Sequence, residues 1–305
     1  MIELKSVTKT FGSGGESLTV LKDINLSIPE GEFLAIVGYS GSGKTTLINL
    51  MAGLHLPSDG EVIAKGQTVT GPSPQRAVVF QNYSLLPWLS VEGNVALAVN
   101  QIFRAESAAD RARRVDHYIE MVGLSPARDK RPGQLSGGMR QRVSVARGLA
   151  MDPDILLLDE PLGALDALTR ATLQDEISRI WQEERKTVVL ITNDVDEALL
   201  LADRVIPLSL GPAATLGPEM IVDLDRPRDR ARLNNNPRFR EMRLQILDYL
   251  LGQREAGRQV VHKKLPLPKI EPEDISHLNL FERWFPGRGP RRRSEIHREP
   301  VEVNS

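Results

Sequence analysis

The sequence predicts an α/β protein organised around a mainly parallel sheet. Three apolar runs support this fold class, at residues 33–37, 155–158 and 187–192, because short unbroken runs are typical of buried parallel strands. The first run leads into apolar residues at helical spacing that end at Gly53, and the third leads into a similar pattern over residues 195–202. Strands followed by helices favour parallel pairing of those strands.

Residues 38–45, Gly-Tyr-Ser-Gly-Ser-Gly-Lys-Thr, match the phosphate-binding pattern G-x-x-x-x-G-K-[ST]. The glycines let backbone N–H groups approach phosphate oxygens, and the helix that follows points its positive end at the same anion. Lys44 adds a full charge near the β- and γ-phosphates, and the Thr45 hydroxyl suits Mg²⁺. A Gly/Ser-rich surface turn is the alternative, but the strand before and the helix after the loop argue against it. The candidate phosphate-binding residues are Gly38, Tyr39, Ser40, Gly41, Ser42, Gly43, Lys44, Thr45 and Thr46.

Composition narrows the class of protein. The chain has 305 residues, enough for one large α/β domain and an appendage, and its formal net charge of −1 argues against a nucleic-acid partner. The absence of cysteine excludes disulfides and thiolate metal sites. The first residues alternate like a strand and do not resemble a signal peptide, and no apolar run is long enough to cross a bilayer. A role at a membrane would therefore need a membrane-embedded partner.

The N-terminal part predicts several short strands. Alternation from Ile2 to Val7 and over residues 20–28 predicts two strands, separated by a Gly-rich turn at residues 12–15, and shorter candidates lie at residues 60–63 and 77–80. Two side chains next to these strands have a structural and a functional interpretation. Phe11 is either a core aromatic or a platform for an adenine ring, and Gln81 is either a loop residue or a ligand of a metal or its bound water.

The segment 83–90 is an apolar loop that contains Leu85, Leu86, Pro87, Trp88 and Leu89. Such a loop is either a surface for a partner or is buried beneath another part of the protein. A helix is predicted over residues 107–122, with Gly123 as its end. The segment 135–141, here called the signature segment, places Ser136, Gly137 and Gly138 at the start of a further helix. Its free N–H groups make it a candidate second anion site.

Two carboxylates follow the apolar run at residues 155–158. Asp159 and Glu160 would therefore lie at the carboxyl edge of the sheet, where open α/β sheets bind their ligands. Asp159 can hold Mg²⁺ through water, and Glu160 can orient and deprotonate an attacking water molecule. Asp166 follows shortly afterwards and precedes a predicted helix that ends at Glu184.

In this order the motifs resemble the ATP-binding cassette (ABC) ATPases, over roughly residues 1–250. The resemblance implies a P-loop NTPase fold with a mainly parallel core, an N-terminal antiparallel β subdomain and an inserted helical subdomain over about residues 83–153. It implies ATP and Mg²⁺ as cofactors and a dimer that closes on two ATP molecules. It also assigns roles that the residues alone leave open. Phe11 would stack on adenine, Gln81 and Asp159 would serve the metal, Glu160 would be the catalytic base, Ser136–Gly138 would bind ATP held by the other subunit, and Asp166 would join the two sites.

Within the family, residues 71–81, 85–88 and 193–198 resemble the bacterial importers of nitrate, sulfonate and taurine, and residues 193–198 are similar to those of the nitrate/nitrite/bicarbonate branch. This resemblance implies ATP hydrolysis coupled to uptake of a small anion, with nitrate or nitrite first and sulfonate, taurine, bicarbonate or cyanate as alternatives. The implied partners are a second cassette, transmembrane permease subunits and, indirectly, a periplasmic or lipoprotein solute-binding protein, with no nucleic acid. The implied location is the cytoplasmic face of the bacterial inner membrane, with the permease as the attachment.

One catalytic position departs from the family pattern. Asn193 stands where most members have a histidine that contacts the γ-phosphate. An asparagine can donate a hydrogen bond but carries no charge, so the rate of hydrolysis is in question and a weakly hydrolysing regulatory cassette is the rival function. Asn193 could also cap the helix that begins near Asp194.

The C-terminal part is expected to differ from a cassette. Asn236-Pro237 predicts the start of a helix that runs to Leu251. Residues 251–305 are enriched in Pro, Arg and Glu and are expected to form a largely disordered extension, with a short amphipathic docking helix near residues 275–285.

Overall fold

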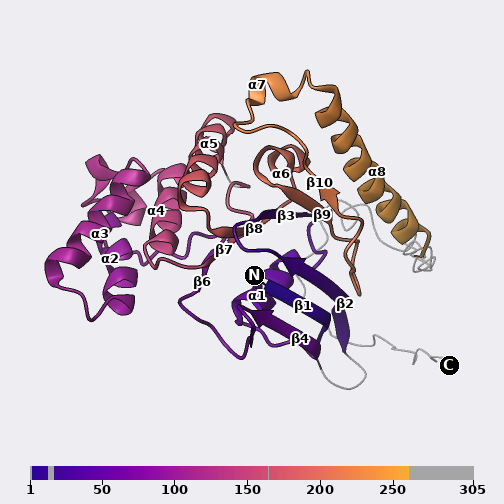
Figure 1. Ribbon diagram of the computed structural model, residues 1–305, viewed down its shortest axis with the longest axis horizontal. Coiled ribbons are helices and arrows are strands. Elements are labelled where there is room, and N and C mark those ends of the chain that lie inside the picture. The colour runs from indigo at the N-terminus through magenta and orange to yellow at the C-terminus, as the bar shows by residue number, and fades with distance from the viewer. Residues whose placement is uncertain (1, 13–16, 164, 261–305) are drawn as a thin grey trace, which may run out of the picture. The chain divides into compact units, whose positions relative to one another are not determined.

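The computed structural model describes residues 2–12, 17–163 and 165–260, and within them it contains two sheets (Figure 1). The smaller sheet is antiparallel, with the strand order β2-β1-β4-β5. Its strands are β1 (Ile2–Phe11), β2 (Leu18–Ile28), β4 (Asp59–Ala64) and β5 (Gln67–Thr68). This sheet is the antiparallel N-terminal subdomain that the sequence predicted.

The larger sheet has six strands in the order β10-β9-β3-β8-β7-β6 within the described part of the chain. All of its neighbouring strands are parallel except β10, which pairs antiparallel with β9. The strands are β3 (Phe33–Val37), β6 (Arg76–Val79), β7 (Ile155–Asp159), β8 (Thr187–Thr192), β9 (Arg204–Pro207) and β10 (Met220–Ile221). The predicted α/β fold class with a mainly parallel core is confirmed.

The larger sheet separates two hydrophobic cores, because successive residues of a strand point to opposite faces. Phe33, Ala35 and Val37 of β3 pack in one core, and Leu34 and Ile36 pack in the other. The first core is completed by α2 to α6 and α8, and the second by α1 and the smaller sheet (Figure 1). The helices are α1 (Lys44–Ala52), α2 (Val91–Ile102), α3 (Ala108–Met121), α4 (Gly137–Leu149), α5 (Ala167–Glu184), α6 (Val195–Leu201), α7 (Arg230–Leu233) and α8 (Pro237–Val260).

Most of the predicted elements are present, with differences at the ends of the chain. Helices α2, α3 and α4 lie within residues 83–153, where the helical subdomain was expected, but α2 and β10 were not predicted. Helix α8 was expected to end at Leu251 and instead continues to Val260, so the proposed domain boundary at residue 250 falls inside a helix and stays a prediction. The extension beyond residue 260 and most of the predicted turn at residues 12–15 lie outside the described residues.

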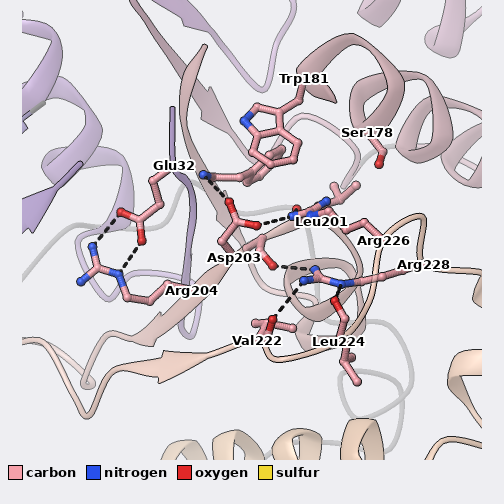
Figure 2. A network of polar contacts seen from close by, with 12 residues as sticks. Glu32, Ser178, Trp181, Leu201, Asp203, Arg204, Val222, Leu224, Arg226 and Arg228 are labelled. Atoms are coloured by element: carbon pink, nitrogen blue, oxygen red, sulfur yellow. Dashed lines mark hydrogen bonds and ion pairs between the residues drawn. The ribbon is translucent and has the colours of Figure 1, made fainter. Parts of the chain in front are cut away.

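Two arginines after β10 fasten α6 to its surroundings (Figure 2). The Arg226 guanidinium donates to Asp203 Oδ1 at 2.8 Å and lies 4.3 Å from the ring centroid of Trp181 in α5. Burial, together with the charge of Arg226, lowers the pKa of Arg228 to about 10. Arg228 donates to the backbone carbonyls of Leu199, Leu200, Ala202, Val222 and Leu224. It thereby satisfies carbonyls at the C-terminal end of α6 that have no partner within the helix.

The start of α4 packs closely against the start of α5. Ser136 caps α4, because its hydroxyl accepts a hydrogen bond from the Met139 N–H at 3.2 Å. A Cβ atom added at Gly138 would overlap the Cγ2 methyl of Thr169, whereas one added at Gly137 would meet its nearest neighbours at 3.5 Å. The close approach of the two helices therefore requires glycine at position 138 and not at position 137.

We predict that Gly138→Ala lowers the free energy of unfolding by about 1–3 kcal/mol, the cost of overpacking a well-packed contact. Gly137→Ala is the matched control, and it should be neutral because its Cβ meets only ordinary contacts. Thr169→Ser, added to Gly138→Ala, removes the obstructing methyl group and should restore most of the lost stability. Chemical denaturation of the parent, the two alanine variants and the double variant measures these differences. Equal stability of the two alanine variants would contradict the packing argument.

Candidate active site

The phosphate-binding pattern forms the loop between β3 and α1, as the sequence predicted. Gly41 and Gly43 have φ angles of 80° and 97°, a region that other residues rarely adopt. A Cβ atom at Gly43 would also lie 2.9 Å from Val20 Cγ1 of β2. Helix α1 begins at Lys44, with Thr45 and Thr46 in its first turn. The loop thus turns tightly into a helix N-terminus, which is a favourable place for a phosphate group.

Lys44 is 4% exposed and its ammonium group has four oxygen neighbours. Nζ donates to the carbonyls of Gly38 at 3.0 Å and Tyr39 at 2.8 Å, and to Asn193 Oδ1 at 2.7 Å. It also pairs with Glu160 Oε1 at 3.3 Å. Burial lowers the pKa of Lys44, and the charge of Glu160 acts in the opposite direction. The lysine therefore brings together the ends of three strands, β3, β7 and β8.

Asp159 and Glu160 occupy different surroundings although they are adjacent. Asp159 is 5% exposed and accepts a hydrogen bond from the Thr45 hydroxyl at 3.1 Å. Burial raises the pKa of the Asp159 carboxyl, and the Thr45 hydrogen bond opposes this rise. Glu160 is more exposed, and it accepts from Gln81 Nε2 at 3.3 Å. Its φ of 44° is unusual for a residue other than glycine, and such strain is often found at functional sites.

The hydroxyl of Thr45 and the carboxylate of Asp159 fit Mg²⁺, which prefers oxygen ligands and usually keeps several waters. Their separation of 3.1 Å places both oxygens beside one point at the start of α1. Gln81 contacts the neighbouring Glu160 through its Nε2, and its amide oxygen is also of a type that suits Mg²⁺. The three residues predicted to serve the metal are therefore at the same edge of the sheet.

The prediction that Asn193 caps a helix is wrong. Asp194 is the N-cap of α6, and its Oδ1 accepts from the backbone N–H groups of Asp196 at 2.9 Å and Glu197 at 3.1 Å. The carboxylate of Asp194 also suits the positive end of the helix better than an amide does. The Asn193 side chain instead accepts a hydrogen bond from Lys44 and lines the cavity beside it.

A cavity of about 480 Å³ opens beside these residues, within the size range of ligand sites. Gln81, Glu160, Gly163 and Asn193 line it. Arg170 of α5, Glu197 of α6 and Arg243 of α8 line it as well, and sequence reasoning missed all three. Arg243 Nε donates to Asp196 Oδ1 at 2.5 Å, which links α8 to α6 at the cavity. Arg170 and Arg243 stand in helices outside the sequence motifs, and Glu197, four residues after Asn193, resembles the acidic residues that are common in the first turn of a helix. No local pattern therefore marks these three residues.

Other predicted residues lie outside this cavity in the described part of the chain. Ser136, Gly137 and Gly138 start α4, and Asp166 caps α5 by accepting from the Thr169 N–H at 3.0 Å. Phe11 ends β1 and is 38% exposed. Its ring stacks edge-on with His55 and lies 5.0 Å from Lys9 Nζ. Phe11 is thus not a core residue, and its stacking on adenine stays a prediction.

Comparison with known proteins identifies relatives that share most of this chain. The nitrate import ATP-binding protein NrtD of Synechococcus elongatus is 49% identical over 244 residues, which are 80% of this chain and 89% of NrtD. The bicarbonate transport ATP-binding protein CmpC of Synechocystis is 48% identical over 265 residues. These cover 86% of this chain and 39% of CmpC, so the chain spans about two-fifths of that relative.

The solved structures point to the same group. A dimeric post-hydrolysis structure of the ATP-binding cassette MJ0796 with ADP and phosphate has a TM-score of 0.66 and 35% identity, and the match covers 74% of this chain and all of that chain. The family model described as ABC transporter matches residues 21–163, from β2 past the pair Asp159–Glu160. On this similarity and on the site geometry, the chain belongs to the ABC transporter family.

Proposed function

We propose that the chain is the ATP-hydrolysing subunit of an importer for a small anion, with nitrate or nitrite as the first candidate. The observation that carries this proposal is the gathering of Lys44, Thr45, Asp159 and Glu160 at one edge of the parallel sheet. The relative NrtD is named for nitrate import, and CmpC for bicarbonate transport. Bicarbonate is therefore the nearest alternative solute, ahead of sulfonate, taurine or cyanate.

The residues divide the chemistry among themselves. The loop at residues 38–45 binds the phosphates of ATP, and Lys44 stabilises the charge that develops on the γ-phosphate. Mg²⁺, when bound by Thr45, Asp159 and Gln81, would neutralise charge on the β- and γ-phosphate oxygens. Glu160 orients a water molecule in the cavity and accepts its proton as the water attacks. Asn193 accepts a hydrogen bond from Lys44 through its Oδ1, and by the family resemblance it stands where most members have a histidine that contacts the γ-phosphate.

The signature segment fits a site that two subunits share. In one chain, Ser136, Gly137 and Gly138 do not line the cavity with Glu160. Ser136 is exposed at the start of α4, where it can meet ATP held by a second cassette. The similarity to a dimeric cassette supports such an arrangement. A heterodimer is favoured over a homodimer, because a partner with a histidine at the position of Asn193 would supply a faster second site.

The apolar loop at residues 83–90 is proposed as the surface that contacts the permease. Trp88 is 65% exposed, which argues against the alternative that this loop is buried. Exposed tryptophans are common anchors at interfaces. Among the described residues no helix is long and apolar enough to span a bilayer. From the proposed contact with a permease and the likeness to NrtD, named as a nitrate import ATP-binding protein, we place the chain at the cytoplasmic face of the bacterial inner membrane, held there by the permease, with a solute-binding protein as an indirect partner.

A regulatory cassette that binds ATP but hydrolyses it slowly is the second candidate function. Asn193 favours it, because an amide cannot carry the positive charge that a histidine can bring to the γ-phosphate. The contact between Glu160 and Lys44 favours an active ATPase over a regulatory cassette, because it places a carboxylate beside the phosphate-binding lysine. Phosphate release by the purified protein, with and without its permease, separates the two functions.

We predict that Glu160→Gln slows hydrolysis by roughly 10²–10⁴-fold, because the amide keeps the shape and hydrogen bonding of the side chain but is not a base. ATP should still bind, and an ATP-bound dimer should accumulate. Phosphate release measures turnover, and near-normal turnover would refute the role of Glu160. A separate experiment tests the identity of the solute. In liposomes that contain the complete transporter with the parent chain, nitrate should stimulate ATP hydrolysis, whereas bicarbonate and taurine should not.

We predict that Trp88→Ala weakens binding to the permease by about tenfold or more, the loss expected for an interface anchor, while ATP affinity stays the same. Leu56→Ala is the matched control, since Leu56 is 50% exposed and lies outside residues 83–90. Recovery of the permease in a pull-down is the measurement. Equal recovery for both variants and the parent would remove Trp88 from the proposed interface.

A further inference from the structure

Glu197 is a buried carboxyl group next to the candidate catalytic residues, and no role described above uses it. It lies in the first turn of α6, is 4% exposed and lines the cavity. In the described part of the chain no lysine, arginine or histidine donates a hydrogen bond to its carboxylate. Burial of an unpaired carboxyl is costly, and it raises the pKa of Glu197. An apolar side chain would pack here at lower cost, so a specific use of the two oxygens is expected.

The two oxygens of Glu197 connect two segments of the site. Oε2 accepts a hydrogen bond from the hydroxyl of Thr192, the last residue of β8, at 2.5 Å. Oε1 accepts from Gln174 Nε2 of α5 at 3.2 Å. The charged side chains that act on Glu197 are Asp194, which follows Thr192 in the chain, and Arg170 of α5. Glu197 therefore bridges the end of β8 and the helix that Asp166 caps.

The contact with Thr192 fixes the position of Asn193. The Thr192 hydroxyl donates to Glu197 and accepts from the Asp194 N–H at 3.0 Å. These bonds join the residue before Asn193 to the residue after it, and so hold the turn that carries Asn193. Asn193 in turn accepts from Lys44 at 2.7 Å. Loss of the Glu197 carboxyl would leave Thr192 without its acceptor and would allow the turn at Asn193 to move.

We propose that Glu197 is a positioning residue for ATP hydrolysis, which holds the Thr192–Asp194 turn so that Asn193 meets Lys44, and which couples this turn to α5 through Gln174. The inference rests on the proposed ATPase function and adds a residue to it. The Asp166 loop at the start of α5 and the Asn193 turn are then linked within one subunit. A change in α5 reaches Asn193 through two side-chain hydrogen bonds.

Three variants test this role. Glu197→Leu removes both hydrogen bonds and should lower kcat about tenfold, because misplacement of a group at a phosphate is costly, while the KM for ATP stays within about twofold. Glu197→Gln keeps an acceptor for Thr192 and should retain most of the activity. Gln174→Leu cuts only the link to α5 and should lower kcat by a smaller factor. Gln182→Leu is the matched control, because Gln182 lies on α5 like Gln174 and, within the residues that the structure describes, its side chain bonds to Ser178 and not to the site.

A double-mutant cycle separates positioning from general destabilisation. If Glu197 acts through Asn193, Glu197→Leu should change kcat by no more than about twofold in an Asn193→Ala background. An undiminished tenfold loss in that background would overturn the proposal. If Glu197→Leu does not fold, the Gln174→Leu cycle with Asn193→Ala gives the same readout with a smaller effect.

Hydrogen exchange provides a readout that does not depend on ATP hydrolysis. The Asp194 amide is protected by Thr192, so Glu197→Leu should accelerate exchange in the peptide that contains residues 192–196. Unchanged exchange there, in a folded variant, would overturn the positioning role. If the parent protein hydrolyses no ATP but Glu197→Leu still accelerates exchange in this peptide, the proposed ATPase function is refuted. The structural link between Glu197 and Asn193 is then still supported.

Discussion

A buried ammonium group joins the residues at the edge of the sheet where the proposed catalytic residues lie. Lys44 comes from the first turn of α1, and its oxygen neighbours come from the loop after β3, from Glu160 after β7 and from Asn193 after β8. A cation at 4% exposure is stable only if oxygen atoms replace its hydration shell. Strands β3, β7 and β8 must therefore end at nearly the same edge of the sheet, so that the residues after them can reach Lys44.

The strand order meets that requirement directly. Strands β7, β8 and β3 are neighbours, with Asp159 opposite Ile191 and Val37 opposite Thr192. The residues that follow each strand then meet at one edge, as is general for ligand sites of parallel sheets. Behind this edge, α6 is fastened by Arg228 at its C-terminal end and by the Asp194 cap at its start. The site thus rests on a rigid sheet, while the residues of α5, α6 and α8 that line the cavity come from the helical side.

Elements with a local signal could be predicted from the sequence, and those with remote partners could not. The strand at residues 33–37, the phosphate-binding loop and the pair Asp159–Glu160 each have a pattern that is complete within a few residues. Helix α2 was missed because polar residues interrupt its apolar face, and one of them, Asn94, is fully buried and bonds to the Leu86 backbone. Arg243 was missed because its partner Asp196 lies 47 residues away in the chain, and Glu197 because one of its two partners, Gln174, comes from another helix. Asn193 was predicted as a site residue, but the alternative role as a helix cap belongs to Asp194.

If Lys44 binds the phosphates of ATP at this edge of the sheet, removing its ammonium group should abolish most of the affinity for ATP. Isothermal titration of Lys44→Ala with ATP and Mg²⁺ tests it most directly, with circular dichroism to show that the variant is folded. We expect the affinity for ATP to fall at least about 100-fold, because charged hydrogen bonds to the β- and γ-phosphates are lost. An unchanged affinity in the folded variant would contradict the account, since the phosphates would then be bound elsewhere.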